Sequence, residues 1–226
     1  MDVPRRSLNF ENEKFYHIFD KGKSDAVVFR EKEDYIRALK TLAFYQFYSP
    51  DIKLSRLLSM TNESQSEYFE KLKERADRLV EIISFCLVPK SLNLLLLQKK
   101  EGGISSFLSQ FLNSYTRYFN SKSKRKGPLF IDSFKAKPVE AEKLSLVSRH
   151  IHLKPFRQSV VSDISELSDY SWSSFWEFTH PEYGALSRKE YILALFDGKE
   201  GKYKEFVENV EDYKNSVSEI KNFVFK

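Results

Sequence analysis

Apolar and polar residues along this chain follow spacings that predict alternating strands and helices. Residues 14–19, 80–87 and 91–98 are short apolar runs bounded by turn residues, which is typical of buried strands. Residues 31–48 and 104–119 carry apolar side chains three and four positions apart, the spacing of one helical face. A three-residue turn with a central proline joins the second and third runs, so these two runs predict a hairpin.

The remaining segments extend this pattern. A capping-box motif, Ser64-Gln65-Ser66-Glu67, predicts the start of an inserted charged helix that continues to Leu79. The later spacings predict a strand over about 129–139, a helix over 141–153, and two C-terminal helices near 187–196 and 202–223.

The order of these elements indicates an α+β fold. Strand, helix, inserted helix, two strands, helix, strand and helix suit a ferredoxin-like antiparallel sheet with helices on one face, plus a helical insertion and a C-terminal helical extension. We therefore expect a ferredoxin-fold domain over 1–157, with the insertion at about 50–79, and a helical extension over 158–226.

Composition narrows the class of protein. Of the 226 residues, 41% are hydrophobic and 31% charged, which describes a globular chain. The longest apolar stretch, Tyr191 to Phe196, is far shorter than the roughly 20 residues that cross a bilayer, so we expect no membrane partner and a cytoplasmic location. The single Cys86 excludes an internal disulfide or a cysteine metal cluster, and its apolar neighbours predict an inert core thiol.

Charge is unevenly distributed along the chain. The net charge is +5, yet residues 117–157 hold 11 basic and three acidic side chains, while the remainder is slightly acidic. Such a stretch is typical of a surface that contacts a phosphate backbone, and it is also compatible with an ordinary solvated surface.

Two polar residues interrupt the apolar strand at 91–98. Ser91 and Asn93 are two positions apart, so both side chains should point to the same side of the sheet. The pattern thus puts a small polar pair on one face of a buried strand.

Eight segments, in this order, resemble single-tyrosine HUH transposases of the REP-associated branch. They are FYHIFDKG (15–22), FCLVP (85–89), GIS (103–105), SYTRYFN (114–120), GPLF (127–130), FKA (134–136), SRHIHLKP (148–155) and YSWSS (170–174). The resemblance spans nearly the whole chain. It implies cutting of single-stranded DNA beside hairpins, a divalent metal (Mg or Mn) held by two histidines, a tyrosine that forms a 5′-phosphotyrosine, and a homodimer.

The chain departs from that family at the residues that carry the chemistry. Ser91 and Asn93 stand where the resemblance implies the histidine pair, and His150 stands where it implies the tyrosine. We therefore expect no intact catalytic residue, no metal site and no cofactor. His150-Ile151-His152 spells a histidine pair, but residues two apart on a helix do not face each other.

A third departure lies at Ile131-Asp132-Ser133, where the resemblance implies Gln-Gly-Arg, so a cation and a glycine are lost. Two tyrosines of the helix predicted over 104–119, Tyr115 and Tyr118, are the other candidate nucleophiles. Tyr115 belongs to the apolar stripe of that helix, which favours core packing.

Three functions agree with the sequence. The first is a catalytically inactive relative that binds single-stranded or hairpin DNA; the second is an active transposase with a rearranged site; the third is a non-enzymatic protein-interaction module. For the first, the predicted DNA-contacting residues are Arg117, Lys122, Lys124, Arg125, Lys126, Lys135, Lys137 and Arg149.

Overall fold

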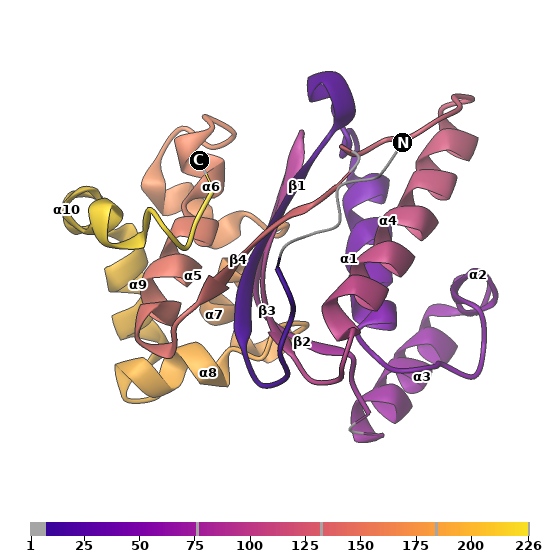
Figure 1. Cartoon of the computed structure of the whole chain (residues 1–226), viewed down its shortest axis with the longest axis horizontal. Helices are drawn as coiled ribbons and strands as arrows, with labels where there is room; N and C mark the ends of the chain where they lie inside the picture. Colours follow the sequence, from indigo (N-terminus) through magenta and orange to yellow (C-terminus); the bar gives the residue numbers. More distant parts are fainter. Residues whose placement is uncertain (1–7, 76, 132, 184, 226) are drawn as a thin grey trace.

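A four-stranded antiparallel sheet forms the centre of the molecule (Figure 1). The computed structural model describes residues 8–75, 77–131, 133–183 and 185–225. The sheet order is β2-β3-β1-β4, and every neighbouring pair is antiparallel. This is the strand order of the predicted ferredoxin-like sheet. Its strands are β1 (Phe15–Lys21), β2 (Val80–Val88), β3 (Ser91–Gln98) and β4 (Lys135–Val139).

Two helices cover one face of the sheet. α1 (Lys32–Tyr45) and α4 (Gly103–Lys122) pack beside each other and bury their apolar stripes against it. The helices predicted over 31–48 and 104–119 are therefore confirmed. Gly103 lies at a close approach, because a Cβ there would sit 2.2 Å from the carbonyl oxygen of Leu79.

The insertion forms a small helical lobe beside this layer. It contains α2 (Leu54–Leu57) and α3 (Asn62–Glu74), which pack around Leu57 and Leu72. The predicted start at Ser64 is wrong: the helix begins at Asn62, and the Thr61 side chain accepts a hydrogen bond from the Ser64 amide. Thr61 offers an oxygen at the position that an N-cap requires, three residues earlier than expected.

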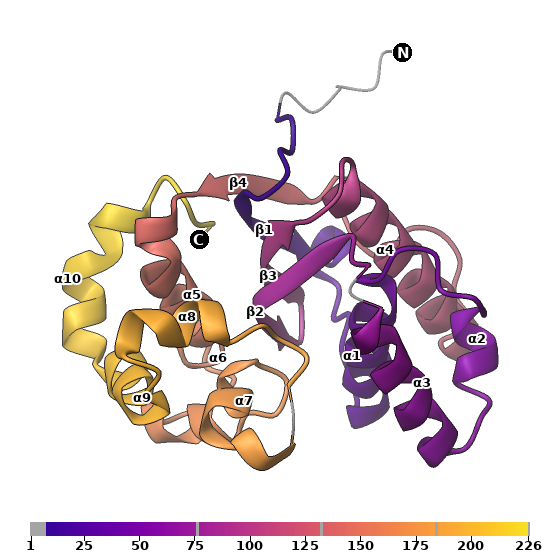
Figure 2. The same ribbon diagram turned by 90° about the horizontal axis from the view of Figure 1, so that it is seen from below.

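Helices also cover the opposite face, which the expected one-sided arrangement did not include (Figure 2). The physical reason is visible in β3, where Leu94 and Leu96 face α1 and α4 while Leu95 and Leu97 face the other way. A strand that is apolar on both faces must be covered on both. The second layer contains α5 (Leu144–His152), α6 (Lys154–Arg157), α7 (Phe175–Thr179), α8 (Glu190–Leu193), α9 (Glu200–Glu208) and α10 (Val210–Ile220).

Two predicted elements have different limits. The single helix expected over 202–223 is divided at Asn209, whose side chain accepts from the Asp212 amide and caps α10. The expected strand over 129–139 is regular only from Lys135, and Asp132 lies outside the described residues. Within the described residues, no helix is long and apolar enough to cross a membrane.

Candidate functional site

Ser91 and Asn93 lie on the sheet face that α5 covers. In β3 they alternate with Leu92 and Leu94, which face the other layer, so the predicted shared side is confirmed. The register pairs Asn93 with Phe19 of β1 and with Cys86 of β2. Both polar side chains are buried, and they therefore form part of an interface between the sheet and α5.

His17 of β1 lies in the same interface, and sequence reasoning did not select it. Its imidazole is fully buried, and burial lowers its pKa to about 3. His17 Nδ1 donates to the carbonyl oxygen of Phe223 at 3.2 Å. Strand pairing could have identified His17, because paired residues of neighbouring strands face the same layer. His17 pairs with Leu95, which faces the second helical layer.

Several buried polar atoms of this interface make no hydrogen bond with any residue that the structure describes. They are Ser91 Oγ, both amide atoms of Asn93, and His17 Nε2. The Asn93 amide lies close enough to His17 to favour its protonation, but the contact lacks hydrogen-bond geometry. Each unpaired buried polar group costs about 1–3 kcal/mol, so this cluster is a costly feature of the core.

These atoms do not fit the divalent metal that the resemblance implies. One neutral imidazole nitrogen, one hydroxyl and one amide bring no charge, whereas divalent cations in proteins are held by charged or strong donors. Across the parts of the chain that the structure describes, no three His, Cys, Asp or Glu side chains gather into a metal-binding group.

His150 of α5 is held in place on every side. Its Nδ1 lies 2.9 Å from the Tyr213 hydroxyl and its Nε2 lies 3.1 Å from the Phe225 carbonyl oxygen. A carbonyl can only accept, so Nε2 carries the proton and Nδ1 accepts. Burial, with the nearby Arg157 charge, lowers its pKa to about 2. This imidazole is neutral and enclosed.

The C-terminal segment covers the same interface. After α10 the chain returns to the sheet (Figure 2), where Lys137 donates to the carbonyl oxygens of Lys221 and Val224. The Phe225 ring lies 5.4 Å from the His17 ring and 5.9 Å from the Phe19 ring, measured between centroids. Residues 221–225 therefore separate His17 and His150 from solvent.

A basic pocket opens at one end of this interface. It has a volume of about 640 Å³, and Ser91 and Phe19 line its wall together with Lys21, Lys90 and Lys135. Lys21 pairs with Asp25 at 2.8 Å. Lys90 and Lys135 are exposed and form no ion pair with any described residue. The pocket thus presents three lysines and one carboxylate, Asp25, which pairs with Lys21 and also lies within the electrostatic reach of Lys90.

A buried lysine lies behind the pocket. Lys154 is 2% exposed, its Nζ is 5.4 Å from the Phe19 ring centroid, and it makes no ion pair with the carboxylates that the structure describes. Burial and the neighbouring Arg157 lower its pKa to about 8.

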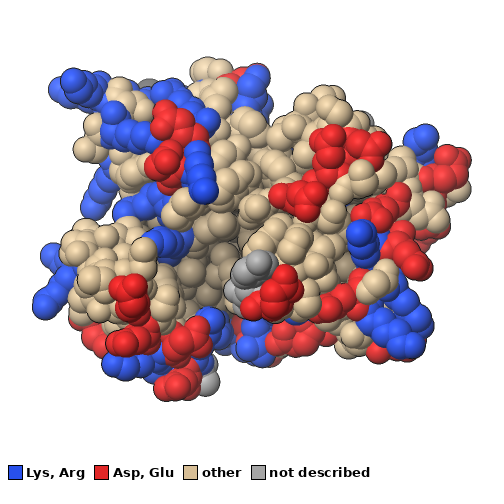
Figure 3. Space-filling model, turned by 180° about the vertical axis from the view of Figure 1, so that it is seen from behind, with Lys and Arg blue, Asp and Glu red and all other residues tan. Residues whose placement is uncertain are grey.

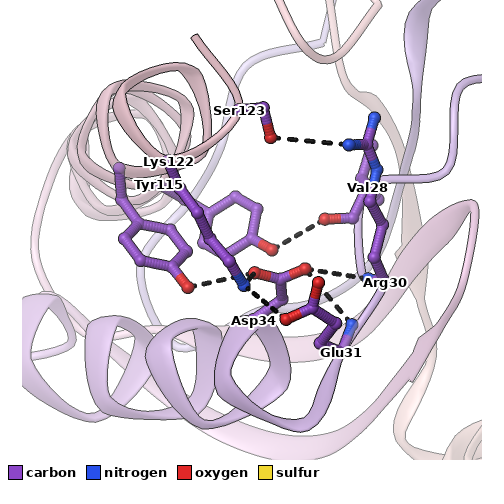
Figure 4. Close-up of polar contacts among 8 residues, drawn as sticks. Val28, Arg30, Glu31, Asp34, Tyr115, Lys122 and Ser123 are labelled. Carbon is purple, nitrogen blue, oxygen red and sulfur yellow. Dashed lines mark hydrogen bonds and ion pairs between the residues drawn. The ribbon is translucent and has the colours of Figure 1, made fainter.

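Four of the predicted DNA-contacting residues form hydrogen bonds or ion pairs with other parts of the protein. They are Lys122, Arg125, Lys137 and Arg149. Lys122 bridges Glu31 and Asp34 (Figure 4), and hydrogen bonds from Lys122 and the Arg30 amide outweigh burial to hold the pKa of Asp34 below its ordinary value. Arg125 donates to Asn120 Oδ1 at the end of α4 and to the Pro128 carbonyl oxygen of its own loop, and Lys137 donates to the C-terminal segment.

The prediction that Arg149 contacts DNA is wrong. It is fully buried, and its guanidinium donates to Asp212, to Ser216 Oγ and to the Phe206 carbonyl oxygen. It therefore fastens α10 to α5 and cannot reach a phosphate. Its position on α5 was correct, but only the tertiary contacts reveal that α10 covers it.

The other four predicted residues remain at the surface. Arg117, Lys124, Lys126 and Lys135 are exposed and pair with no carboxylate among the residues described. Figure 3 shows Lys and Arg side chains gathered at the end of the molecule where α1 begins and α4 ends, at the upper left of that view. This end carries the loop with Lys124 and Lys126.

Comparison with known proteins gives distant similarity to solved structures. No family model matches the chain, and no curated protein matches it. The chain is similar in arrangement to a solved structure described as a REP-associated tyrosine transposase bound to a REP hairpin, with 13% identity and a TM-score of 0.48. That similarity covers 83% of this chain and 90% of the other. The function of this chain must be inferred from its own residues.

Proposed function

We propose that this protein binds single-stranded or hairpin DNA and does not cleave it. The observation that carries the proposal is the basic pocket beside Ser91, with unpaired Lys90 and Lys135 at its mouth. Ser91 is one of the positions where the eight segments imply catalytic residues. A phosphate backbone is the ligand that a local surplus of exposed cations favours.

Further cations extend the proposed contact surface. Lys124 and Lys126 are exposed on the loop after α4, and they would contact phosphates without reading the base sequence. Together with Lys90 and Lys135 they make up the proposed backbone-contacting set. Arg149 is left out because it is buried, and Lys122 and Arg125 contribute charge while remaining bonded within the protein.

The proposed absence of cleavage is supported by the side chains at Ser91, Asn93 and His150, the positions where the resemblance implies catalytic residues. Ser91 and Asn93 offer neutral oxygens in place of imidazoles, and His150 is enclosed by Tyr213, Arg157 and Phe225. A nucleophile must reach the phosphorus, and a metal must polarise the phosphate. Neither requirement is met by these side chains. The homodimer, the cytoplasmic location and the division at residue 157 stay predictions.

The test is fluorescence anisotropy of a labelled DNA hairpin with a single-stranded flank, measured across a range of NaCl concentrations. We expect the logarithm of affinity to fall linearly with the logarithm of salt, with a slope of about −0.7 for each contacted single-strand phosphate. Lys124→Glu/Lys126→Glu should weaken binding and flatten that slope.

The matched control is Lys71→Glu/Lys199→Glu, which makes the same charge change at exposed lysines on α3 and before α9. It should leave the affinity within twofold. No binding at low salt, or an affinity that salt does not change, would refute the proposal.

A further inference from the structure

The outer face of α4 contains no carboxylate. Ser109, Gln110, Asn113, Ser114 and Arg117 follow one another at helical spacing and form one stripe. None of the 20 residues of α4 is Asp or Glu, although 32 of the 226 residues in the chain are acidic. Surface helices ordinarily mix both signs of charge. This stripe is therefore suited to an anionic ligand.

Arg37 of α1 faces this stripe. Its guanidinium donates to Ser114 Oγ at 3.4 Å and lies 5.3 Å from the centroid of the Tyr118 ring. Its Nε is buried and makes no hydrogen bond, and no described carboxylate pairs with it. A guanidinium has five donors in a fixed fork that matches phosphate geometry, so Arg37 is only partly satisfied by the protein.

The insertion supplies the third wall. Lys53, just before α2, and Ser55, within it, join α1 and α4 around a groove of about 750 Å³. Figure 1 shows the inserted lobe against the same side of the molecule as α1 and α4. Among the described residues, three cations line the groove, namely Arg37, Lys53 and Arg117, and no carboxylate does. It lies on the helical layer opposite the one that covers Ser91 and His150.

We propose that this groove is a second nucleic-acid contact, which holds backbone phosphates of a single strand. Arg37 and Arg117 clamp a phosphate, the hydroxyl and amide groups of α4 donate to its oxygens, and the half-buried Tyr45 ring is available for a base to stack on. The inference rests on the proposed DNA binding and extends it to a surface that the insertion completes.

The experiment compares Arg117→Glu/Lys53→Glu with the charge-matched Lys71→Glu/Lys199→Glu, using a fluorescein-labelled 20-residue oligothymidylate. Arg117, Lys53, Lys71 and Lys199 are all exposed, so folding should be retained, and circular dichroism checks this. We expect the groove variant to lose at least tenfold in affinity and the control less than twofold. A second measurement follows the Arg37 Nε–Hε signal by NMR during titration with the same oligonucleotide and, separately, with pyrophosphate.

Each outcome separates this inference from the proposed function. A tenfold loss together with a shift of the Arg37 signal supports the groove. If the oligonucleotide binds but neither the groove variant nor the Arg37 signal changes, the groove inference is overturned while DNA binding stands. If pyrophosphate shifts the signal but the wild-type protein binds no DNA, both proposals fail, and the groove serves a phosphate compound of another kind.

Discussion

His17 of β1 faces His150 of α5 across the interface between the sheet and the second helical layer, with ring centroids 6.1 Å apart and the rings nearly perpendicular. Both rings donate to main-chain carbonyl oxygens of the C-terminal segment. His17 Nδ1 donates to Phe223, and His150 Nε2 donates to Phe225. Two buried imidazoles without a described carboxylate partner must both be neutral. The pair therefore makes the stability of the fold sensitive to acid.

Introducing the residues that the resemblance implies is the direct test of the proposed lack of cleavage. We expect the triple variant Ser91→His, Asn93→His, His150→Tyr to form a covalent adduct with a labelled single-stranded hairpin in Mn²⁺, because it contains the two metal ligands and the nucleophile that the resemblance implies. The wild-type protein, run beside it on a denaturing gel, should form none. An adduct in the wild-type lane would contradict the proposed loss, and mapping the modified residue would identify the nucleophile.

Acid should destabilise the protein below about pH 6.5. Burial lowers the pKa of His17 and His152 to about 3 and that of His150 to about 2, so the unfolded chain binds protons that the folded chain does not. The stability is complete above the ordinary histidine pKa and falls as the pH drops toward 3.

Each buried histidine contributes a slope of up to about 1.4 kcal/mol per pH unit in that window. Urea unfolding at pH 7.5, 6 and 5 measures it, and His150→Gln should reduce the slope. A free energy of unfolding that stays constant across these pH values would show that the imidazoles are not buried as described.

Arg149 should matter for stability and not for DNA. Arg149→Ala removes the link from α5 to Asp212, Ser216 and the Phe206 carbonyl, and it leaves Asp212 partly exposed to water. We expect a loss of about 2–4 kcal/mol in the free energy of unfolding. Affinity for the hairpin, measured where the variant is folded, should stay within twofold. A tenfold loss of affinity at unchanged stability would restore Arg149 to the DNA-contacting set.

A buried hydrogen-bond chain fastens the second layer. The Tyr203 hydroxyl lies 2.6 Å from Ser148 Oγ and 2.8 Å from His152 Nδ1, and His152 Nε2 lies 2.7 Å from Ser174 Oγ. Tyr203→Phe should cost about 1–3 kcal/mol, because buried polar groups lose a partner. Tyr48→Phe is the control, since the Tyr48 side chain is about half exposed. Equal stability of the two variants would mean that the chain of bonds contributes nothing.

The sequence by itself determined the elements and much of the sheet. The alternation in β3 assigned Ser91 and Asn93 to one side, and the helical spacing of α4 assigned Tyr115 to the core, where its hydroxyl donates to the Val28 carbonyl. Both results follow from local geometry, because strand and helix periods are properties of the backbone itself. The same local rules gave the hairpin and, through the order of the elements, the α+β class.

Only the tertiary structure decided which charges remain available. Arg149 is covered by α10, Lys122 is bonded to Asp34 of α1, and Lys137 is bonded to the C-terminal segment, each more than 50 residues away in the chain. Spacing along a helix or strand carries no information about such distant partners. For the same reason, His17 joined the site only through strand pairing, and the basic groove emerged only where the insertion meets α1 and α4.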